Sequence, residues 1–546
     1  MTDSLNIALA QLNPTVGDMA GNAKLVREAR AKAAAAGADL VVASELIVTG
    51  YPPEDIVVRG SFLDAAAAAV DGLMKDTADG GPALIIGTPW RIDGKVHNAA
   101  LLLEGGKIAA VRLKHDLPNY GVFDEKRVFV AGPMPGPVNF RGVRLGLQVC
   151  EDMWTPDVSE CLQESGAELL VVINGSPFDI EKPDMRLNLA IARVQETGLP
   201  LIYVNQVGGQ DELVFDGASF ALNSDFALAA QAKSWESDLV LTKWSRNGET
   251  WHCANGTKAT PPEKLATIYG ALVMGLRDYV GKNGFPGVII GLSGGIDSAI
   301  TAAVAADALG PDRVRCVMMP SPYTSKESLE DAAAVAKMLK VKLDSISIEP
   351  AMKAFDAMLK PAFGNLPPDI TEENLQARAR GITLMALSNK TGWMVLSTGN
   401  KSEMSAGYAT LYGDMCGGYS VLKDVYKTTV FALSKWRNAQ AKGPAMPERV
   451  ITKPPTAELK PNQKDEDTLP PYSTLDAILE RLVERDMSIA DVAKEGFDEA
   501  LVARVWRMLQ TAEYKRRQAP PGVKISSRSL SRDRRYPITN AFKGPR

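Results

Sequence analysis

Cysteine and histidine are scarce in this sequence, with five and three residues among 546. Five cysteines in a chain of this length argue against a disulfide framework. No uncharged apolar run approaches the roughly 20 residues of a membrane span. The N-terminus, MTDSLNIALAQLNP, lacks the basic region and long apolar core of a signal peptide. We therefore expect a soluble cytoplasmic protein with no membrane partner.

Neither sign of charge is in excess. The chain has 61 Lys and Arg against 65 Asp and Glu, a formal net charge of −4. A chain of that charge is not a general binder of polyanions, so we expect no nucleic-acid partner. Hydrophobic residues make up 45% of the 546 residues. At roughly 150 residues per domain, such a chain should build more than one core.

Short apolar runs predict buried strands in residues 1–250. The runs are LNIALAQL, ADLVVASEL, PALIIGTPW, KIAAVRL, VRLGLQV, ELLVVIN and PLIYVNQ. Helical patterns fall between several of them, and Asp-Gly and Gly-Gly turn signals mark hairpins between residues 90 and 113. This mixture predicts an α/β sandwich rather than a purely parallel sheet.

Residues 251–264 contain Gly and paired Pro and predict a linker, so a second domain should span 265–546. In that domain apolar strand patterns such as VRCVMMP and WMVLST alternate with helical patterns such as KESLEDAAAVAKML. Alternation of this kind predicts a doubly wound parallel sheet. The stretch 447–472 is rich in Pro and charge and predicts a mobile loop. Whether this loop closes over the active site as a lid stays an open hypothesis.

A glycine-rich turn, GLSGGIDS at 291–298, follows the apolar run Val288–Ile290 and precedes a helical pattern. Small residues let the backbone approach a phosphate closely, and the start of a helix favours an anion. The turn lacks the Gly-Lys-Ser/Thr ending of a Walker A loop. Asp297 can hold Mg²⁺, which prefers carboxylate and phosphate ligands. The turn therefore predicts a phosphate site of another kind.

A second group of polar residues lies near the next strand end. Thr398 follows WMVLS, at the carboxyl end of a strand, where ligands bind in open α/β sheets. Glu403 is a second carboxylate candidate for Mg²⁺, although an acid in the first turn of a helix is also common. Asn374 and Arg378 lie near the start of a predicted helix, and spacing alone does not decide whether they bind an anionic substrate.

Three reactive side chains stand at the ends of predicted strands in the first domain: Glu45, Lys114 and Cys150. They can converge at one edge of a sheet. A thiolate attacks an amide carbonyl, and a nearby lysine should favour the thiolate over the thiol. The glutamate can carry the proton to departing ammonia. A lone cysteine after a strand is also typical of an inert buried residue, so the whole set carries the hypothesis.

The sequences around these residues resemble the nitrilase superfamily, whose Glu-Lys-Cys triad hydrolyses C–N bonds through a thioester. They are SELIVTGYPPEDI, LKHDLPNYGVFDEKR and VCEDMW. The resemblance implies an α-β-β-α sandwich. It implies that Glu45 is the general base, Lys114 the triad lysine and Cys150 the nucleophile. It also implies that glutamine is bound by Tyr120, Ser176 and Lys182.

The second domain resembles two nested families. SGGIDS is similar to the PP-loop of ATP-pyrophosphatases, which hold the pyrophosphate that leaves ATP. NLQARAR, STGNKSE and YGDMCGGYS, in that order after SGGIDS, resemble the synthetase domain of NAD synthetases. The two domains in this order resemble the glutamine-dependent NAD synthetase family. For ATP the resemblance implies Gly291, Leu292, Ser293, Gly294, Gly295, Ile296, Asp297, Ser298, Thr398, Lys427 and Thr456. For deamido-NAD it implies Asn374, Arg378, Glu403 and Lys515, and for Mg²⁺ it implies Asp297 and Glu403.

Together the resemblances cover essentially the whole chain and imply one reaction. Glutamine would supply ammonia, ATP and Mg²⁺ would activate the carboxylate of deamido-NAD as an adenylate, and an internal channel would carry the ammonia. Synthetase domains of this family dimerise, so a homo-oligomer is implied as well. Two alternatives stay open: a PP-loop amidotransferase that adenylates another carboxylate, and a non-catalytic protein that binds nucleotide and reports nitrogen status.

The C-terminal tail, 514–546, is the one strongly basic segment, with ten Lys or Arg and one Asp. Such a tail can bind nucleic acid. The family resemblance favours a different role, in which the tail neutralises the phosphates of ATP and the dinucleotide substrate and Lys515 lies closest to them.

Overall fold

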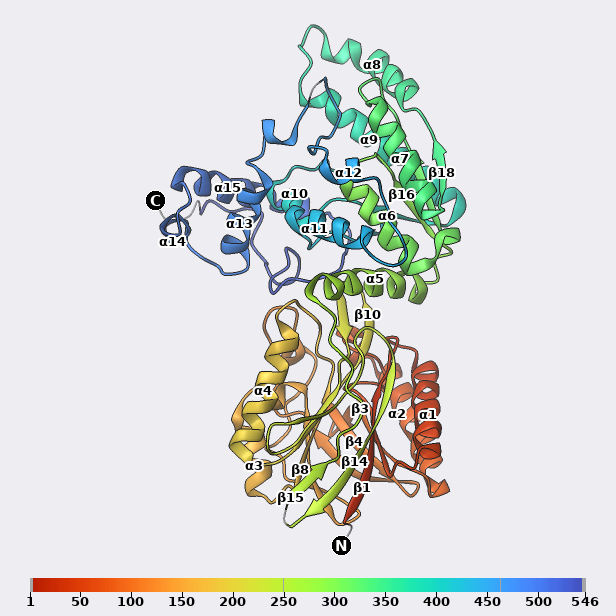
Figure 1. Cartoon of the computed structure of the whole chain (residues 1–546), viewed down its shortest axis with the longest axis vertical. Coiled ribbons are helices and arrows are strands. Elements are labelled where there is room, and N and C mark those ends of the chain that lie inside the picture. Colours follow the sequence, from red (N-terminus) through yellow and green to blue (C-terminus); the bar gives the residue numbers. More distant parts are fainter. Residues whose placement is uncertain (1–2, 249, 462, 543–546) are drawn as a thin grey trace. The chain divides into compact units, whose positions relative to one another are not determined.

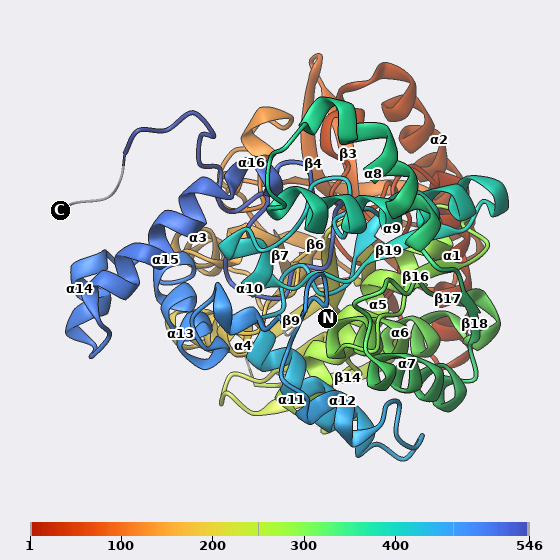
Figure 2. The ribbon, with the colours of Figure 1, turned by 90° about the horizontal axis from the view of Figure 1, so that it is seen from above.

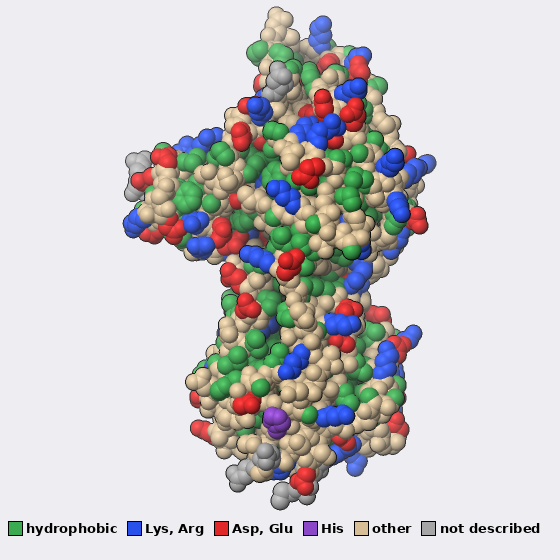
Figure 3. Space-filling model, in the orientation of Figure 1, with side chains coloured by type: hydrophobic (Ala, Val, Ile, Leu, Met, Phe, Trp, Pro, Cys, Tyr) green, Lys and Arg blue, Asp and Glu red, His purple; other side chains and the backbone are tan. Residues whose placement is uncertain are grey.

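The computed structural model describes residues 3–248, 250–461 and 463–542, which form two compact units, 1–263 and 264–546 (Figure 1). Among these described residues, no helix combines the length and apolar character that crossing a bilayer requires. On the face shown in Figure 3, Lys and Arg side chains are interspersed with Asp and Glu. Each unit is described below by itself.

The N-terminal unit is built on two large sheets. The first has the order β15 (Thr250–Cys253), β14 (Asp238–Asn247), β1 (Ser4–Gln11), β2 (Leu40–Val42), β3 (Ala83–Ile92), β4 (Lys95–Glu104), β5 (Lys107–Leu113). The second has the order β13 (Leu228–Gln231), β12 (Phe220–Leu222), β9 (Leu201–Asn205), β8 (Leu169–Asn174), β7 (Val143–Val149), β6 (Val138–Phe140). A small hairpin joins β10 (Val207–Gln210) to β11 (Leu213–Asp216).

Alternation along the strands explains why this unit has four layers. Ile7 and Leu9 of β1 lie in a core shared with β7 and β8 of the other sheet, so the two sheets pack face to face. Ala8 and Ala10 face the other way and pack under α1 (Met19–Ala35) and α2 (Gly60–Asp76). Helices α3 (Pro156–Glu164) and α4 (Lys182–Thr197) cover the second sheet in the same manner.

This arrangement confirms the predicted α-β-β-α sandwich, and each of the predicted apolar runs contains a strand. The sequence patterns missed β6 and β10 to β15. All of these strands except β14 have only three or four residues, and the second half of β14, KWSRN, is mostly polar. Nevertheless β14 pairs with β1 along its length, from Ser4 with Ser245 to Gln11 with Asp238. Strand β15 falls within the start of the predicted linker.

The C-terminal unit has one parallel sheet in the order β18 (Lys342–Ser345), β17 (Val314–Met318), β16 (Val288–Gly291), β19 (Met394–Ser397), β20 (Tyr419–Ser420). The strand order runs outward in both directions from β16, so the crevice at the carboxyl ends of β16 and β19 is the topological switch point. This confirms the predicted doubly wound sheet.

Helices link these strands. They are α5 (Lys264–Lys282), α6 (Ile296–Leu309), α7 (Lys326–Leu339), α8 (Glu349–Phe363), α9 (Ile370–Thr391), α10 (Lys401–Ala406), α11 (Lys427–Asn438) and α12 (Glu448–Thr452). Ile289, Val317 and Val395 of the sheet pack against Ala379 and Leu384 of α9. Helix α12 and a 3₁₀ turn, Asp465–Asp467, lie within the predicted loop 447–472.

Helices α13 (Tyr472–Val483), α14 (Ile489–Lys494) and α15 (Glu499–Thr511) form a separate cluster beside the sheet, with its own core (Figure 2). Short helix α16 (Glu513–Arg516) ends it. The chain after it is anchored by Lys401 of α10, which is fully buried. The Lys401 ammonium lies 2.9 Å from Asp424 and donates hydrogen bonds to Ser526 Oγ at 2.7 Å and Arg528 O at 3.0 Å.

Candidate functional site

Three strand ends of the N-terminal unit carry the predicted acid, amine and thiol. Glu45 follows β2, Lys114 follows β5 and Cys150 follows β7, and all three are buried. Cys150 has φ +49, in the left-handed region that a residue with a side chain rarely adopts, and a 3₁₀ turn begins there. Backbone strain of this kind at a reactive side chain is typical of functional sites.

Lys114 joins two carboxylates. Its ammonium lies 2.8 Å from Glu45 Oε1 and 2.9 Å from both oxygens of Glu125. Burial by itself lowers the pKa of Lys114, but Glu125 and Glu45 outweigh it and raise that pKa well above the ordinary value. Lys114 is therefore a permanent cation held between two acids, rather than an amine that exchanges protons.

Neighbouring groups fix the Glu45 carboxylate. Asn98 of β4 donates a hydrogen bond to Oε1 at 2.7 Å, and the Gly175 N–H donates one to Oε2 at 2.7 Å. Tyr51 donates its hydroxyl to Glu125 Oε1 at 2.9 Å. The strand-end criterion missed Glu125, because it lies in the turn after Lys114 rather than at the end of a strand. Its place within the motif LKHDLPNYGVFDEKR is the signal that could have found it.

Burial raises the pKa of the Cys150 thiol well above its ordinary value, and Glu45 adds to the rise. Lys114 lowers that pKa only in part, because its charge is shared with two carboxylates. Lys114 thus favours the thiolate, as expected, but burial outweighs its effect. Burial therefore favours the protonated thiol, so nucleophilic attack by its sulfur would need a base to remove the proton.

Asp152 holds the lysine loop and the cysteine turn together. Its fully buried carboxylate accepts hydrogen bonds from the N–H groups of His115 at 2.9 Å, Asp116 at 2.8 Å and Val149 at 3.0 Å. Lys114 precedes the first two groups and Cys150 follows the third. Asp152 thereby sets the distance between the two reactive residues.

Replacing Asp152 by alanine should lower the free energy of unfolding of the N-terminal unit by about 3 kcal/mol or more, because buried N–H groups lose their acceptor. Thermal denaturation measures the change. Asp157→Ala, at an exposed position of α3, should shift unfolding far less. Equal stability of the two variants would contradict the role given to Asp152.

The three glutamine-binding positions implied by resemblance make different contacts, one of which reaches the residue after Cys150. The Tyr120 hydroxyl donates to Glu151, the residue after Cys150, at 2.9 Å. Ser176 Oγ accepts a hydrogen bond from Arg186 at 3.0 Å. The Lys182 ammonium lies 5.0 Å from the ring centre of Trp154 and 5.6 Å from that of Phe123, and Phe123 also contacts Tyr120.

In the C-terminal unit, residues 291–298 join β16 to α6 at the switch point of the sheet. Gly294 has φ +84, and a Cβ there would lie 2.3 Å from Ser328 O of α7. Only glycine fits both constraints. The Ser293 and Ser298 hydroxyls lie 3.1 Å apart, and Ser293 Oγ also accepts the Gly295 N–H at 3.2 Å.

A cavity of about 290 Å³ opens over this loop. All residues from 291 to 298 line it, and so do Thr398, Lys427 and Thr456, the other positions implied for ATP. Thr398 comes from the end of β19, Lys427 from the start of α11, and Thr456 from the chain after α12. The structure therefore gathers this predicted set into one cavity from elements far apart in sequence.

Two carboxylates and a lysine mark one end of the cavity. The Lys427 ammonium forms ion pairs with Asp297 and, at 3.2 Å, with Glu403, and Asn400 donates to Asp297 at 2.8 Å. Burial raises the pKa of Glu403, and Lys427 opposes the rise. Among the described residues no group of three or more acids, His or Cys is placed to hold a metal. Two carboxylates plus phosphate oxygens still fit Mg²⁺, which commonly takes few protein ligands.

Asn374, Arg378 and Lys515 meet elsewhere, on the loop 407–411. Thr410 donates to Asn374 at 3.1 Å, Arg378 donates to Leu411 O at 3.3 Å, and Lys515 donates to Gly407 O and Ala409 O at 2.7 Å. Tyr408 and Ala409 of that loop line the cavity. The three residues thus support its wall, whereas Glu403 lines it directly.

Several basic residues of the C-terminal tail form ion pairs with acids of the same unit. Arg516, Arg517 and Arg534 pair with Glu513, Arg528 with Asp486, and Lys524 with Asp533. Lys543 and Arg546 of the predicted tail lie outside the described residues. These contacts argue for a structural use of much of this positive charge.

Comparisons with known proteins define the class of each unit. Residues 6–248 match the family model for carbon-nitrogen hydrolases, and residues 268–519 match that for NAD synthases. The chain is 48% identical to a glutamine-dependent NAD(+) synthetase of Rhodobacter capsulatus, over the full length of both proteins. It is 46% identical to one of Acinetobacter baylyi, over 99% of each chain. The chain belongs to the family of glutamine-dependent NAD(+) synthetases.

Two solved structures extend the comparison. The glutamine-dependent NAD+ synthetase of Acinetobacter baumannii in complex with ADP matches with a TM-score of 0.80 and 43% identity, over 100% of both chains. A glutamine-dependent NAD(+) synthetase of Cytophaga hutchinsonii matches with a TM-score of 0.84 and 22% identity, over 98% of each. The second likeness concerns the fold alone.

Proposed function

We propose that this chain makes NAD⁺ from deamido-NAD, using ATP for activation and glutamine as the source of ammonia. The observation that carries the proposal is the presence, in one chain, of the buried Glu45–Lys114–Cys150 set and of the cavity over residues 291–298. The first set suits amide hydrolysis and the second suits adenylation of a carboxylate. Similarity along the whole chain to glutamine-dependent NAD(+) synthetases supports the combination.

In the hydrolytic half, Glu45 takes the proton from Cys150 as the sulfur attacks the amide carbon of glutamine. The developing oxyanion is stabilised by the Lys114 ammonium and by the N–H group after Cys150. When the C–N bond breaks, Glu45 returns the proton to the departing ammonia. Water then cleaves the thioester and releases glutamate, which restores the thiol.

In the synthetic half, the carboxylate of deamido-NAD attacks the α-phosphorus of ATP. The bond to the β-phosphate breaks and pyrophosphate leaves into the loop 291–298. Ammonia then attacks the acyl carbon of the adenylate, loses a proton and expels AMP. Serine hydroxyls and backbone N–H groups of the loop stabilise the leaving anion. Asp297 and Glu403 would hold Mg²⁺, which neutralises phosphate charge when bound.

The test is NAD⁺ formation from deamido-NAD, ATP and Mg²⁺, with glutamine or with ammonium chloride as nitrogen source. We expect product with both. No product with either would mean that the substrate is another carboxylate. Absence of any conversion of ATP to AMP would instead point to a protein that binds nucleotide without catalysis.

Replacing Glu125 by glutamine should reduce glutamate release about 10²-fold, because Lys114 loses one of its two carboxylate partners while the shape of the site is kept. Burial raises the pKa of Glu125 to about 7, so small changes around this carboxyl can change whether it is charged. Glutamate release measures the effect, and the exposed Glu164→Gln is the control. Full activity of the Glu125 variant would exclude it from the reactive set.

We also propose a homo-oligomer. Large apolar side chains stand exposed on α8, α9 and the turn between them, namely Met358, Leu366, Ile370 and Ile382, each at least 60% exposed. Such a concentration of exposed apolar residues is typical of a protein–protein interface. Light scattering of the purified protein should give a mass of at least two chains, and a monomer at micromolar concentration would contradict this.

A further inference from the structure

The loop expected to hold pyrophosphate contains no lysine or arginine between residues 291 and 298. Walker-type loops carry a lysine of their own to reach the phosphates. Pyrophosphate is a polyanion, and backbone N–H groups and hydroxyls neutralise only part of its charge. Cations for it must therefore come from other segments that line the cavity.

The basic residues among the described lining of the cavity are Arg380, Lys427 and Lys453. Lys427 is committed to the two acids Asp297 and Glu403. Arg380 lies on α9 and donates to Met319 O at 3.2 Å. Lys453 is the cation that bonds to Ser328, next to the loop, and neither the sequence patterns nor the family resemblance singled it out.

Lys453 lies directly beside the phosphate loop. Its ammonium donates a hydrogen bond to Ser328 Oγ at 2.8 Å. The backbone of Ser328 abuts the loop so closely that a Cβ on Gly294 would lie 2.3 Å from Ser328 O. The lysine side chain is 25% exposed, so its charge reaches the cavity while its stem is packed.

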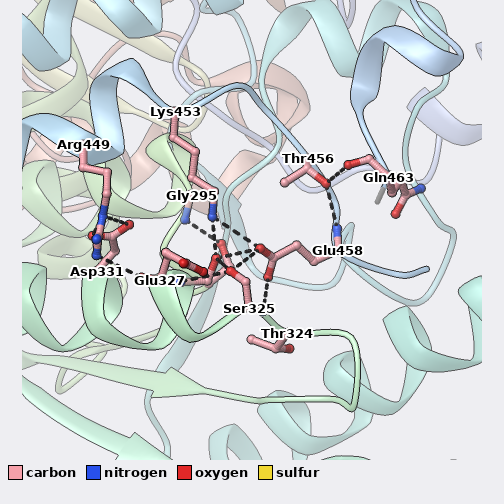
Figure 4. Close-up of polar contacts among 12 residues, drawn as sticks. Gly295, Thr324, Ser325, Glu327, Asp331, Arg449, Lys453, Thr456, Glu458 and Gln463 are labelled. Carbon is pink, nitrogen blue, oxygen red and sulfur yellow. Dashed lines mark hydrogen bonds and ion pairs between the residues drawn. The ribbon is translucent and has the colours of Figure 1, made fainter. Parts of the chain in front are cut away.

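A carboxylate of the same segment holds this ammonium. We call residues 453–459, all of which line the cavity, the strap. Glu458 of the strap lies 3.3 Å from the Lys453 ammonium (Figure 4). Its carboxylate also accepts hydrogen bonds from Ser325 Oγ at 2.7 Å, Ser328 Oγ at 2.8 Å and Ser325 N–H at 3.2 Å. These bonds anchor the strap to the start of α7.

The same C-terminal end of the strap is also fixed to α9. Gln376 donates to Leu459 O at 2.8 Å, Gln463 donates to Glu373 at 3.1 Å, and Lys460 pairs with Glu373 at 3.2 Å. At the other end of the strap, the Lys453 N–H donates to Arg449 O at 2.8 Å, so the Lys453 backbone is held as well. Its four-carbon stem lets the ammonium turn without any movement of the strap.

We propose that Lys453 is the cation that binds the terminal phosphates of ATP and the departing pyrophosphate. Glu458 and Ser328 hold the ammonium beside the loop, and it exchanges the Glu458 carboxylate for phosphate oxygens when nucleotide binds. The inference rests on the proposed function, because it takes residues 291–298 to be the pyrophosphate loop.

The experiment measures binding of Mg²⁺-pyrophosphate, Mg²⁺-ATP and AMP to the full chain by calorimetry. Lys453→Met should weaken pyrophosphate and ATP about 10- to 100-fold, the range for loss of a charged hydrogen bond. AMP has no β- or γ-phosphate, so its affinity should not change. Lys453→Arg keeps the charge and should recover most of the loss.

Lys460→Met is the matched control, because Lys460 lies just past the strap, is half exposed and pairs with Glu373 outside the cavity lining. It tests whether loosening the strap is enough to weaken pyrophosphate binding. Equal effects of the Lys453→Met and Lys460→Met variants, or a loss of AMP affinity in Lys453→Met, would overturn the proposal.

Glu458→Gln removes the competing charge and should tighten pyrophosphate binding. If that variant weakens pyrophosphate as much as Lys453→Met does, both residues merely hold the strap and the inference fails. These measurements need no turnover. A wild-type chain that binds pyrophosphate through Lys453 yet makes no NAD⁺ would refute the proposed substrate and leave this inference standing.

Discussion

Replacing Cys150 by alanine should abolish NAD⁺ formation from glutamine and leave formation from ammonium chloride intact. Among the described residues, the Cys150 thiol is the only group positioned to form the thioester. Loss of a nucleophile typically lowers the reaction rate on the order of 10⁴-fold or more. The synthetic site lies in a separate compact unit, 264–546, so its use of free ammonia does not need the thiol. The measurement is the NAD⁺ formation rate with each nitrogen source.

Cys161→Ala is the matched control for this result. Cys161 is a free cysteine of the same unit, on α3, and donates to Pro135 O rather than to any member of the reactive set. It should keep both activities. Loss of the ammonium-driven rate in the Cys150 variant, with an unchanged unfolding temperature, would contradict the division of labour between the units.

Replacing Asp297 by asparagine should reduce NAD⁺ formation from both nitrogen sources by at least about 10²-fold. The change removes one of the two carboxylates proposed for Mg²⁺, whose contribution to phosphoryl chemistry is several kcal/mol. It also removes an ion pair of Lys427. Folding should survive, because Lys427 keeps Glu403 as a partner.

A direct measurement of metal binding distinguishes loss of the metal ligand from a general defect of the protein. Titration with Mn²⁺ in the presence of ATP, followed by electron paramagnetic resonance, should show weaker metal binding in Asp297→Asn. The exposed Asp312→Asn, before β17, should bind metal and synthesise NAD⁺ as the wild type does. Normal metal affinity together with lost synthesis would assign Asp297 another task.

Sequence patterns gave the sheets and the strand-end residues because those depend on local information. A buried run ends, a reactive residue follows, and parallel neighbours bring such ends to one edge. Glu45, Lys114 and Cys150 were found in this way, and so was the turn at 291–298. Strands such as β14 were missed, because a strand paired along β1 needs little apolar signal of its own.

Contacts between distant loops could not be predicted. Glu125 reaches Lys114 from a turn, and Asp152 reaches back to His115 and Asp116 across more than 30 residues. The pairing of Lys453 and Glu458 with α7 spans more than 120 residues. The net direction of the Cys150 pKa could not be predicted either, because the burial that outweighs the effect of Lys114 is a property of the folded site.

The chemical reactivity of buried lysine side chains can report whether each unit is folded. Lys114 in the N-terminal unit and Lys401 in the C-terminal unit are fully buried and held by acids. An amine-reactive label should therefore spare both in the native protein, while surface lysines such as Lys24 and Lys326 react at once. Modification of either buried residue reports opening of its own unit, so mass spectrometry of one digested sample can follow both unfolding events separately.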